Sequence, residues 1–132
     1  MRGKLITHHW QLEVYQPAMK SAVAVFKLSK DFPADEKFSL TSQVRNSSRS
    51  VTAQIAEGWR KRRYEASFVH KLNDAEGEAA ETQGWLEHAV KCEYLDRATA
   101  KELFHDYDLI IGKLVTMQNN PKPWLLTQPH QR

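Results

Sequence analysis

Four long segments of the chain repeat apolar residues at helical spacing, and this pattern constrains the fold more than any other feature. These segments cover residues 14–31, 39–62, 64–91 and 96–118. No stretch between them alternates apolar and polar residues as a half-buried strand does. Because short connections between long helices favour antiparallel neighbours, the sequence predicts an all-α fold, an antiparallel up-down four-helix bundle. We expect one domain over residues 1–132, with a flexible tail over 119–132.

Local signals set the expected ends of the helices. Pro17 fits the first turn of the first segment, where a missing N–H costs little. Phe32-Pro33 ends that segment, because the residue before a proline avoids the helical region. Ser39 or Thr41 is expected to cap the second segment, and Asp96 is expected to cap the fourth.

Small residues predict close packing at two places. Ser47, Ser48 and Gly58 follow one face of the second segment, so a neighbouring helix can approach it closely. Gly77 and Gly84 lie inside the third segment, where each costs ~1 kcal/mol relative to alanine. We expect close packing to compensate for these two glycines.

Composition excludes several classes of protein. Apolar residues make up 41% of the chain and charged residues 27%, with 5 Gly and 5 Pro. These values are typical of a globular protein, and they exclude a disordered tail, a collagen-like chain and a disulfide scaffold. The lone Cys92 cannot form an internal bridge, which suits a reducing compartment. No apolar run approaches the ~20 residues that span a bilayer, and no signal sequence is recognisable. We expect a cytoplasmic protein that does not enter a membrane.

Charge is distributed unevenly along the chain, although the net charge is only +3. The balances are +2 over 1–44, +5 over 45–73, −6 over 74–106 and +2 over 107–132. Such blocks arise from complementary faces within a fold or between subunits, from a phosphate-facing patch, or from ordinary solvated helix faces.

Two linked motifs carry a family resemblance. The first is Phe32-Pro33, then Glu36, then Leu40-Thr41-x-Gln43-x-Arg45, and the second is Gln54-Ile55-Ala56-Glu57-Gly58. This pattern resembles the four-helix-bundle proteins encoded within intervening sequences of bacterial 23S rRNA genes. The resemblance implies a homopentamer without established enzymatic activity. It also implies a relation to the accessory variability protein of diversity-generating retroelements, which binds nucleic acid.

The most distinctive local feature is Trp59-Arg60-Lys61-Arg62-Arg63-Tyr64, four cations between two aromatic residues. Such a run can contact phosphates and stack on bases. If the second helix continues through it, Arg45, Arg49, Arg60 and Arg63 lie on one stripe. Arginine suits phosphate because its planar fork donates two hydrogen bonds together. The candidate nucleic-acid contacts are Arg45, Arg49, Arg60, Lys61, Arg62, Arg63 and Lys71. The alternative is that these side chains keep a helix end soluble and pair with acidic residues of a neighbouring subunit.

Catalytic and metal chemistry have weaker support in the sequence. Di-iron bundles need two Glu-x-x-His pairs, and only Glu102 and His105 have that spacing. His88 and Cys92 are four residues apart and could join His105 around zinc, but the set is incomplete. Glu76, Glu78 and Glu81 fit a solvated helix face. We therefore expect no catalytic, metal or cofactor site and no enzymatic activity.

The sequence favours a homo-oligomeric binding protein that binds RNA or DNA. The alternative is a scaffold that recruits another protein through the acidic 74–106 surface. Assembly is expected because the first helix carries two apolar stripes (Ala18, Ala22, Val25 and Met19, Val23, Phe26), more than a monomeric bundle needs. The four tryptophans, Trp10, Trp59, Trp85 and Trp124, also lie near helix ends, where one small core cannot easily bury them all. The basic 45–73 region could meet the acidic 74–106 region of the next subunit.

Overall fold

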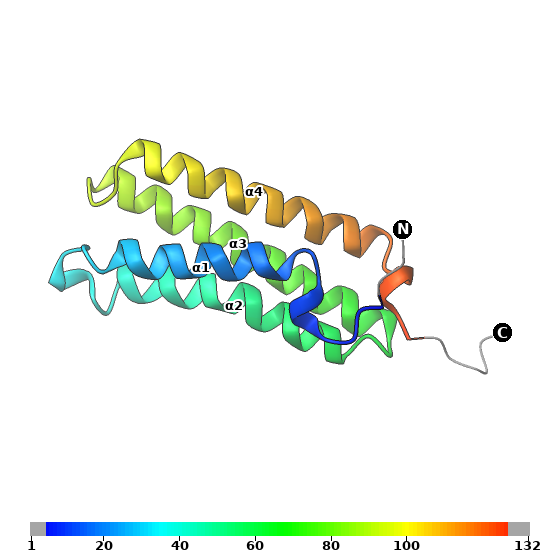
Figure 1. The fold of residues 1–132 in the computed structure, drawn as a ribbon. Coiled ribbons are helices and arrows are strands. Elements are labelled where there is room, and N and C mark those ends of the chain that lie inside the picture. The colour runs from blue at the N-terminus through cyan, green and yellow to red at the C-terminus, as the bar shows by residue number, and fades with distance from the viewer. Residues whose placement is uncertain (1–4, 127–132) are drawn as a thin grey trace.

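The computed structural model describes residues 5–126, and four long helices dominate it (Figure 1). They are α1 (Tyr15–Ser29), α2 (Leu40–Arg60), α3 (Glu65–Lys91) and α4 (Arg97–Asn119), with short 3-10 helices at His9–Gln11, Ala34–Glu36 and Lys122–Trp124. Each long helix begins and ends within two residues of its predicted bounds, and residues 5–126 contain no strand. In Figure 1 the connections alternate between the two ends of the molecule, so successive helices run in opposite directions. The predicted all-α four-helix fold is confirmed.

The helices pack in chain order. α3 lies between α2 and α4 and shares most of its contacts with them, whereas α1 packs chiefly on α2 and touches α4 less. Within the described part of the chain, no helix is both long enough and apolar enough to cross a lipid bilayer.

α1 begins where its proline allows. Val14 occupies the N-cap position and Pro17 the third helical position, inside the first turn as predicted. The amides of the first turn have no intrahelical acceptor, so this proline breaks no helical hydrogen bond. After the helix ends at Ser29, the buried Phe32 anchors the chain ahead of Pro33.

Carboxylates cap both α2 and α4. Ser39 occupies the N-cap position of α2, but its side chain makes no capping hydrogen bond. Instead, the Leu40 amide donates to Glu36 Oε1 at 3.1 Å. Ser39 is the N-cap residue as predicted, but the side-chain acceptor at this helix start is Glu36, because the preceding 3-10 turn brings its carboxylate to the first helical amide. Asp96 caps α4 as predicted, accepting from the Thr99 amide at 2.9 Å; this hydrogen bond lowers the pKa of Asp96.

Glu36 also ties two connections together. The hydroxyl of Tyr94 donates to Glu36 Oε2 at 2.9 Å, and this bond raises the pKa of Tyr94 to about 12. The Tyr94 ring lies beside that of Phe32, with 5.8 Å between centroids. The α1–α2 connection is therefore fixed to the α3–α4 turn at one end of the bundle.

The core combines large apolar side chains with small residues. Its largest fully buried members include Phe68, Leu72, Tyr107 and Ile110. Gly58 provides close approach as predicted, since a Cβ there would lie 3.1 Å from Lys71 Cβ. A Cβ on Gly77 or Gly84 would meet no atom within 4 Å. The expectation of tight packing at these two glycines is wrong for the single chain, because both lie on outward positions of α3.

The apolar stripes and the tryptophans are only partly exposed. On α1 the stripe that contains Ala18 and Val25 is buried, whereas Met19 and Val23 of the second stripe are 37% and 43% exposed. Trp10 is 49% exposed, but Trp59 is buried, at 3%. Trp85 and Trp124 are half-buried against the core. The expectation that the tryptophans are poorly buried is therefore wrong for Trp59, which the amino-terminal segment covers.

The expected flexible tail over 119–132 is wrong as far as residue 126. α4 includes Asn119, Pro121 is buried, and Trp124 and Leu125 pack against the core. The Leu126 amide donates to the Arg62 carbonyl at 3.4 Å. Apolar burial of Pro121, Trp124 and Leu125 holds this part of the chain in place. Residues 127–132 lie outside the described part of the chain.

Candidate nucleic-acid interface

Charge divides the bundle into two layers. α1, its C-cap Lys30, and α2 together carry six Lys and Arg residues and one carboxylate, Glu57. α3 and α4 carry nine carboxylates and five Lys and Arg residues. Because α1 packs chiefly on α2, these two helices form one side of the bundle. We call the first pair of helices the basic layer and the second pair the acidic layer.

A cluster of cations surrounds Phe26 on the basic layer. Lys30 Nζ and Arg45 Cζ each lie 4.8 Å from the centroid of its ring, and Arg49 Cζ lies 5.3 Å away. These distances are typical of cation–π attraction. Arg45 is also held by a hydrogen bond from Nε to Ser29 Oγ at 2.7 Å. Within residues 5–126, none of the three cations lies within 4.0 Å of a carboxylate. The Phe26 cluster is thus a fixed, uncompensated positive patch.

The predicted arginine stripe ends earlier than expected. α2 stops at Arg60, and the next residues turn toward α3, with the Lys61 amide donating to the carbonyls of Glu57 and Gly58. Arg63 therefore does not share the helical stripe of Arg45, Arg49 and Arg60. Arg60, Lys61 and Arg63 are all exposed at this turn. They form a second cation group, about 16 Å along the helix axis from Arg49.

Arg62 differs from its neighbours in that turn. Its guanidinium lies 3.7 Å from the centroid of the Trp59 ring, and Nη1 donates to the Trp59 carbonyl at 2.7 Å. Burial, and then the charge of Arg60, lower the pKa of Arg62. The Trp59 indole donates in turn to the Thr7 carbonyl at 3.3 Å. Arg62 therefore joins α2 to both terminal segments and is less available to a ligand than sequence reasoning expected.

Lys71 is also engaged. Its ammonium lies 2.8 Å from Glu57 Oε1 and donates to Gln54 Oε1 at 3.4 Å. The hydrogen bond between Lys71 and Glu57 lowers the pKa of Glu57 and raises the pKa of Lys71. Glu57 belongs to the second family motif, and its partner is this lysine on α3. The pair neutralises Lys71 and connects α2 to α3.

The other titratable groups considered from the sequence do not form a site. Among residues 5–126, no three His, Cys, Asp or Glu side chains lie together as a metal would require, so His88, Cys92 and His105 form no such group. Glu76 accepts from Gln118 at 2.9 Å and Glu81 from the Trp85 indole at 3.0 Å. These carboxylates thus have partners within the acidic layer.

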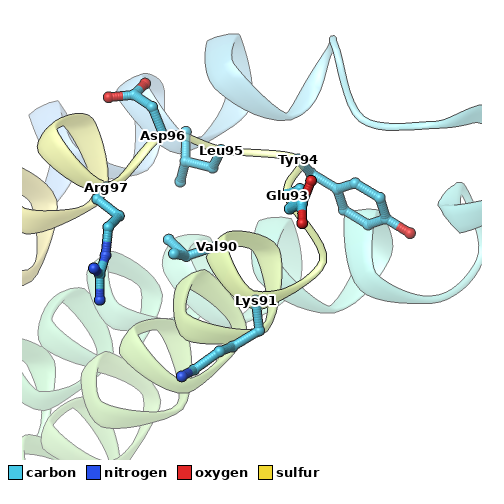
Figure 2. A pocket seen from close by; sticks show the side chains of 7 residues that line it. All are labelled: Val90, Lys91, Glu93, Tyr94, Leu95, Asp96 and Arg97. Carbon is cyan, nitrogen blue, oxygen red and sulfur yellow. The ribbon is translucent and has the colours of Figure 1, made fainter.

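A hollow of about 570 Å³ lies at the α3–α4 turn, and the charged side chains that line it do not converge on one point. It is lined by Val90, Lys91, Glu93, Tyr94, Leu95, Asp96 and Arg97. The charged ends of Lys91, Asp96 and Arg97 point in different directions (Figure 2). Asp96 already serves as the cap of α4. This hollow offers no convergent set of ligand groups.

Sequence reasoning missed Phe26 and Lys30 as parts of the basic surface. In the sequence Phe26 belongs to an apolar stripe, and Lys30 carries no signal beyond its place four residues later, at the end of the same helix. The cluster exists because α1 and α2 pack side by side, and sequence spacing shows only the α2 half, Arg45 and Arg49.

Comparison with known proteins identifies similar chains. The model of the family described as 23S rRNA-intervening sequence protein matches residues 10–116. The crystal structure of a protein of unknown function from the S23 ribosomal protein family of Bacteroides thetaiotaomicron VPI-5482 has 29% sequence identity and a TM-score of 0.73. The match covers 81% of this chain and 96% of that chain. No curated protein matches the chain, and a relation to retroelement accessory proteins stays a prediction.

Proposed function

The chain belongs to the 23S rRNA-intervening sequence protein family, and we propose that it is a non-catalytic, homo-oligomeric, cytoplasmic protein whose basic layer binds RNA or DNA. One observation carries this proposal. The three cations of the Phe26 cluster converge on one ring, and within residues 5–126 no carboxylate lies within 4.0 Å of them.

Cations without carboxylate partners favour a phosphate ligand. Each phosphate that they neutralise releases condensed counterions, which drives binding at low salt. Arg45 and Arg49 are also held in place by the Phe26 ring, so less side-chain freedom is lost when a ligand binds. α1 itself contains no carboxylate, and α2 contains none before Glu57. A polyanion can therefore follow α1, and α2 as far as Arg49, without meeting a carboxylate of these two helices.

The exposed α2–α3 turn extends this surface. Arg60, Lys61 and Arg63 lie about 16 Å along α2 from Arg49, a length that covers about five phosphates of one duplex strand. We expect binding that depends on backbone charge and shows little sequence preference.

Affinity measurements on paired variants test the proposal. The double variant Arg45→Ala/Arg49→Ala should weaken binding of a labelled oligonucleotide and reduce the slope of log K against log salt by about two. The matched control is Arg97→Ala/Lys101→Ala, which removes two exposed cations from the acidic layer. Equal effects of the two double variants would remove the Phe26 cluster from the interface. Absence of binding by the wild type at low salt would reject the function.

A second candidate is supported by the acidic layer. Glu81, Glu87 and Glu102 are exposed there, and a basic protein partner could dock on them as on an electrostatic platform. In this scaffold function, the protein recruits a partner through the 74–106 surface without binding nucleic acid.

Self-association is proposed from an apolar groove of about 590 Å³ along α4 and the amino-terminal segment. It is lined by Ile6, Leu12, Glu13, Val14, Leu109, Gly112, Lys113, Thr116, Met117 and Trp124. Leu109 is 53% exposed there. Glu13 and Lys113 pair across it at 3.3 Å, which leaves the groove close to neutral and suited to an apolar contact with a second copy. A pentamer is the state that the family resemblance implies.

A further inference from the structure

A small hollow opens on the basic layer between α1 and α2. It has a volume of about 170 Å³ and is lined by Met19, Ala22, Val23, Phe26, Arg49 and Thr52. Met19 and Val23 are 37% and 43% exposed at its rim, although both are apolar. The core does not use Met19 and Val23, and the proposed self-association groove lies on a different face, along α4.

The hollow has both apolar and cationic walls. Arg49 forms one wall, while Arg45 and Lys30 gather on the Phe26 ring beside it. Lys20 and Lys27 precede and follow Val23 by about one helical turn, and both are exposed. The hydroxyl of Thr52 donates to the carbonyl of Arg49 at 2.9 Å, so its proton is already used. The hollow thus offers apolar contact and positive charge, and its directional hydrogen-bond donors are those of the Arg49 guanidinium.

An occupant must satisfy both kinds of wall. An apolar helix from a second copy would desolvate the surrounding cations without compensating them. A flat, apolar group attached to phosphates matches the surface, because its faces contact Met19, Val23 and the Arg49 guanidinium while its phosphates meet the cations.

We propose that this hollow binds one unstacked base of single-stranded RNA or DNA. This inference rests on the proposed function and names its ligand class. In a duplex each base is stacked and paired, and taking a base out of the duplex costs free energy. Contacts in a shallow surface hollow do not compensate for this cost. A single strand can turn a base into the hollow and place its flanking phosphates on Arg45, Arg49 and the α1 lysines. The Arg49 guanidinium can stack on the face of any base and the Thr52 hydroxyl is already bonded, so we expect the base to be held by contact area with little preference among bases.

Anisotropy titrations with labelled oligouridylate, oligothymidylate and a duplex, each about 12 units long, test this assignment. We expect wild-type protein to bind both single strands more tightly than the duplex. The variant Val23→Gln should weaken single-strand binding about fivefold, because a polar amide replaces part of the apolar contact with the base. It should leave duplex binding and the salt slope unchanged, because no charge is removed. Met19→Gln serves as a second variant, and Val115→Gln on α4 makes the same valine substitution on the acidic layer.

The alternative outcomes separate the two proposals. Equal binding of strands and duplex, with no effect of Val23→Gln or Met19→Gln, would overturn the base hollow while leaving nucleic-acid binding intact. No binding of any oligonucleotide would overturn both. A fall in oligomer mass caused by Val23→Gln would assign the hollow to a second copy and overturn the inference. Melting curves of both variants identify any loss of binding that is due to unfolding.

Discussion

At the scale of single residues, the α2–α3 turn separates cations that have the same charge but different surroundings. Arg60, Lys61 and Arg63 are exposed. Arg62 stacks on Trp59 and donates to its carbonyl, while its own carbonyl accepts from Leu126. A side chain held in this way supports the turn, and the other three are free to meet phosphate.

This difference predicts distinct effects of alanine substitutions in the turn. Arg60→Ala/Lys61→Ala/Arg63→Ala should weaken oligonucleotide binding and lower the salt slope by up to about three, with little change in the melting temperature. Arg62→Ala should lower the melting temperature, because it removes the stacking on Trp59 and a part-buried hydrogen bond to the Trp59 carbonyl. It should lower the salt slope less than the triple variant does. Salt titrations and thermal melts measure both quantities. The reverse assignment, with Arg62 dominating the slope, would contradict this account of the turn.

At the scale of helices, caps and glycines make separate contributions. The Asp96 carboxylate caps α4, and its pKa is lowered by the bond from the Thr99 amide. Its stabilisation is therefore complete above the ordinary carboxyl pKa and is lost as the pH falls through the lowered pKa of the folded protein.

Asp96→Ala should accordingly lower the melting temperature at neutral pH and have less effect in acid. The physical reason is that the protonated carboxyl is a weaker acceptor for the Thr99 amide than the carboxylate. Melting curves from neutral pH down to below the ordinary carboxyl pKa measure the difference between wild type and variant. A difference that stays constant over this range would show that the charge of Asp96 does not contribute.

Glycines on α2 and α3 should respond in opposite ways to added side chains. Gly77→Ala and Gly84→Ala should each raise the free energy of unfolding by about 0.5–1 kcal/mol, because alanine favours the helix and meets no neighbouring atom. Gly58→Val should lower it, since the Cβ position is already 3.1 Å from Lys71 Cβ. Chemical denaturation at fixed protein concentration measures all three. A destabilising Gly77→Ala would indicate that a second chain covers this position.

Helix ends were easier to predict than partners across the bundle. Local signals predict these ends: the spacing of apolar residues, Pro17 in the first turn of α1, and Asp96 before α4. The observed helix ends agree with these predictions. The capping carboxylate of Glu36 and the lysine partner of Glu57 depend on how turns and neighbouring helices come together. Those contacts are set by tertiary packing, which a single sequence does not display.

At the scale of the whole molecule, the layers of charge differ from the blocks along the chain. The block 45–73 pointed to a basic surface, yet Lys71 in that block is neutralised by Glu57. Lys30 lay in a nearly balanced block but joins the basic layer through Phe26. The charge blocks are defined by position along the chain, whereas the charge layers depend on which helices are neighbours. Of the basic surface, only Arg45, Arg49 and the α2–α3 turn could therefore be predicted from the sequence.

Assembly is predicted at the same scale. Light scattering should give a mass near five chains of 15.3 kDa, the number that the family resemblance implies. Leu109→Glu should reduce this mass because it places a charge in the apolar groove along α4, whereas Val23→Gln should not. A concentration-independent monomer would contradict the assembly. Dissociation by high salt or by Arg45→Ala/Arg49→Ala would instead place the contact between basic and acidic layers.

The central claim is that nucleic acid lies on the basic layer, and lysine labelling with an amine-reactive reagent tests it without altering the chain. Lys20, Lys27 and Lys30 are exposed on α1 and at its end, and Lys91 and Lys101 are exposed on the acidic layer. Mass spectrometry of protein labelled with and without a saturating oligonucleotide compares their reactivity. The account predicts that the oligonucleotide protects the α1 lysines and leaves Lys91 and Lys101 as reactive as before. Protection of Lys91 and Lys101 with unprotected α1 lysines would contradict it.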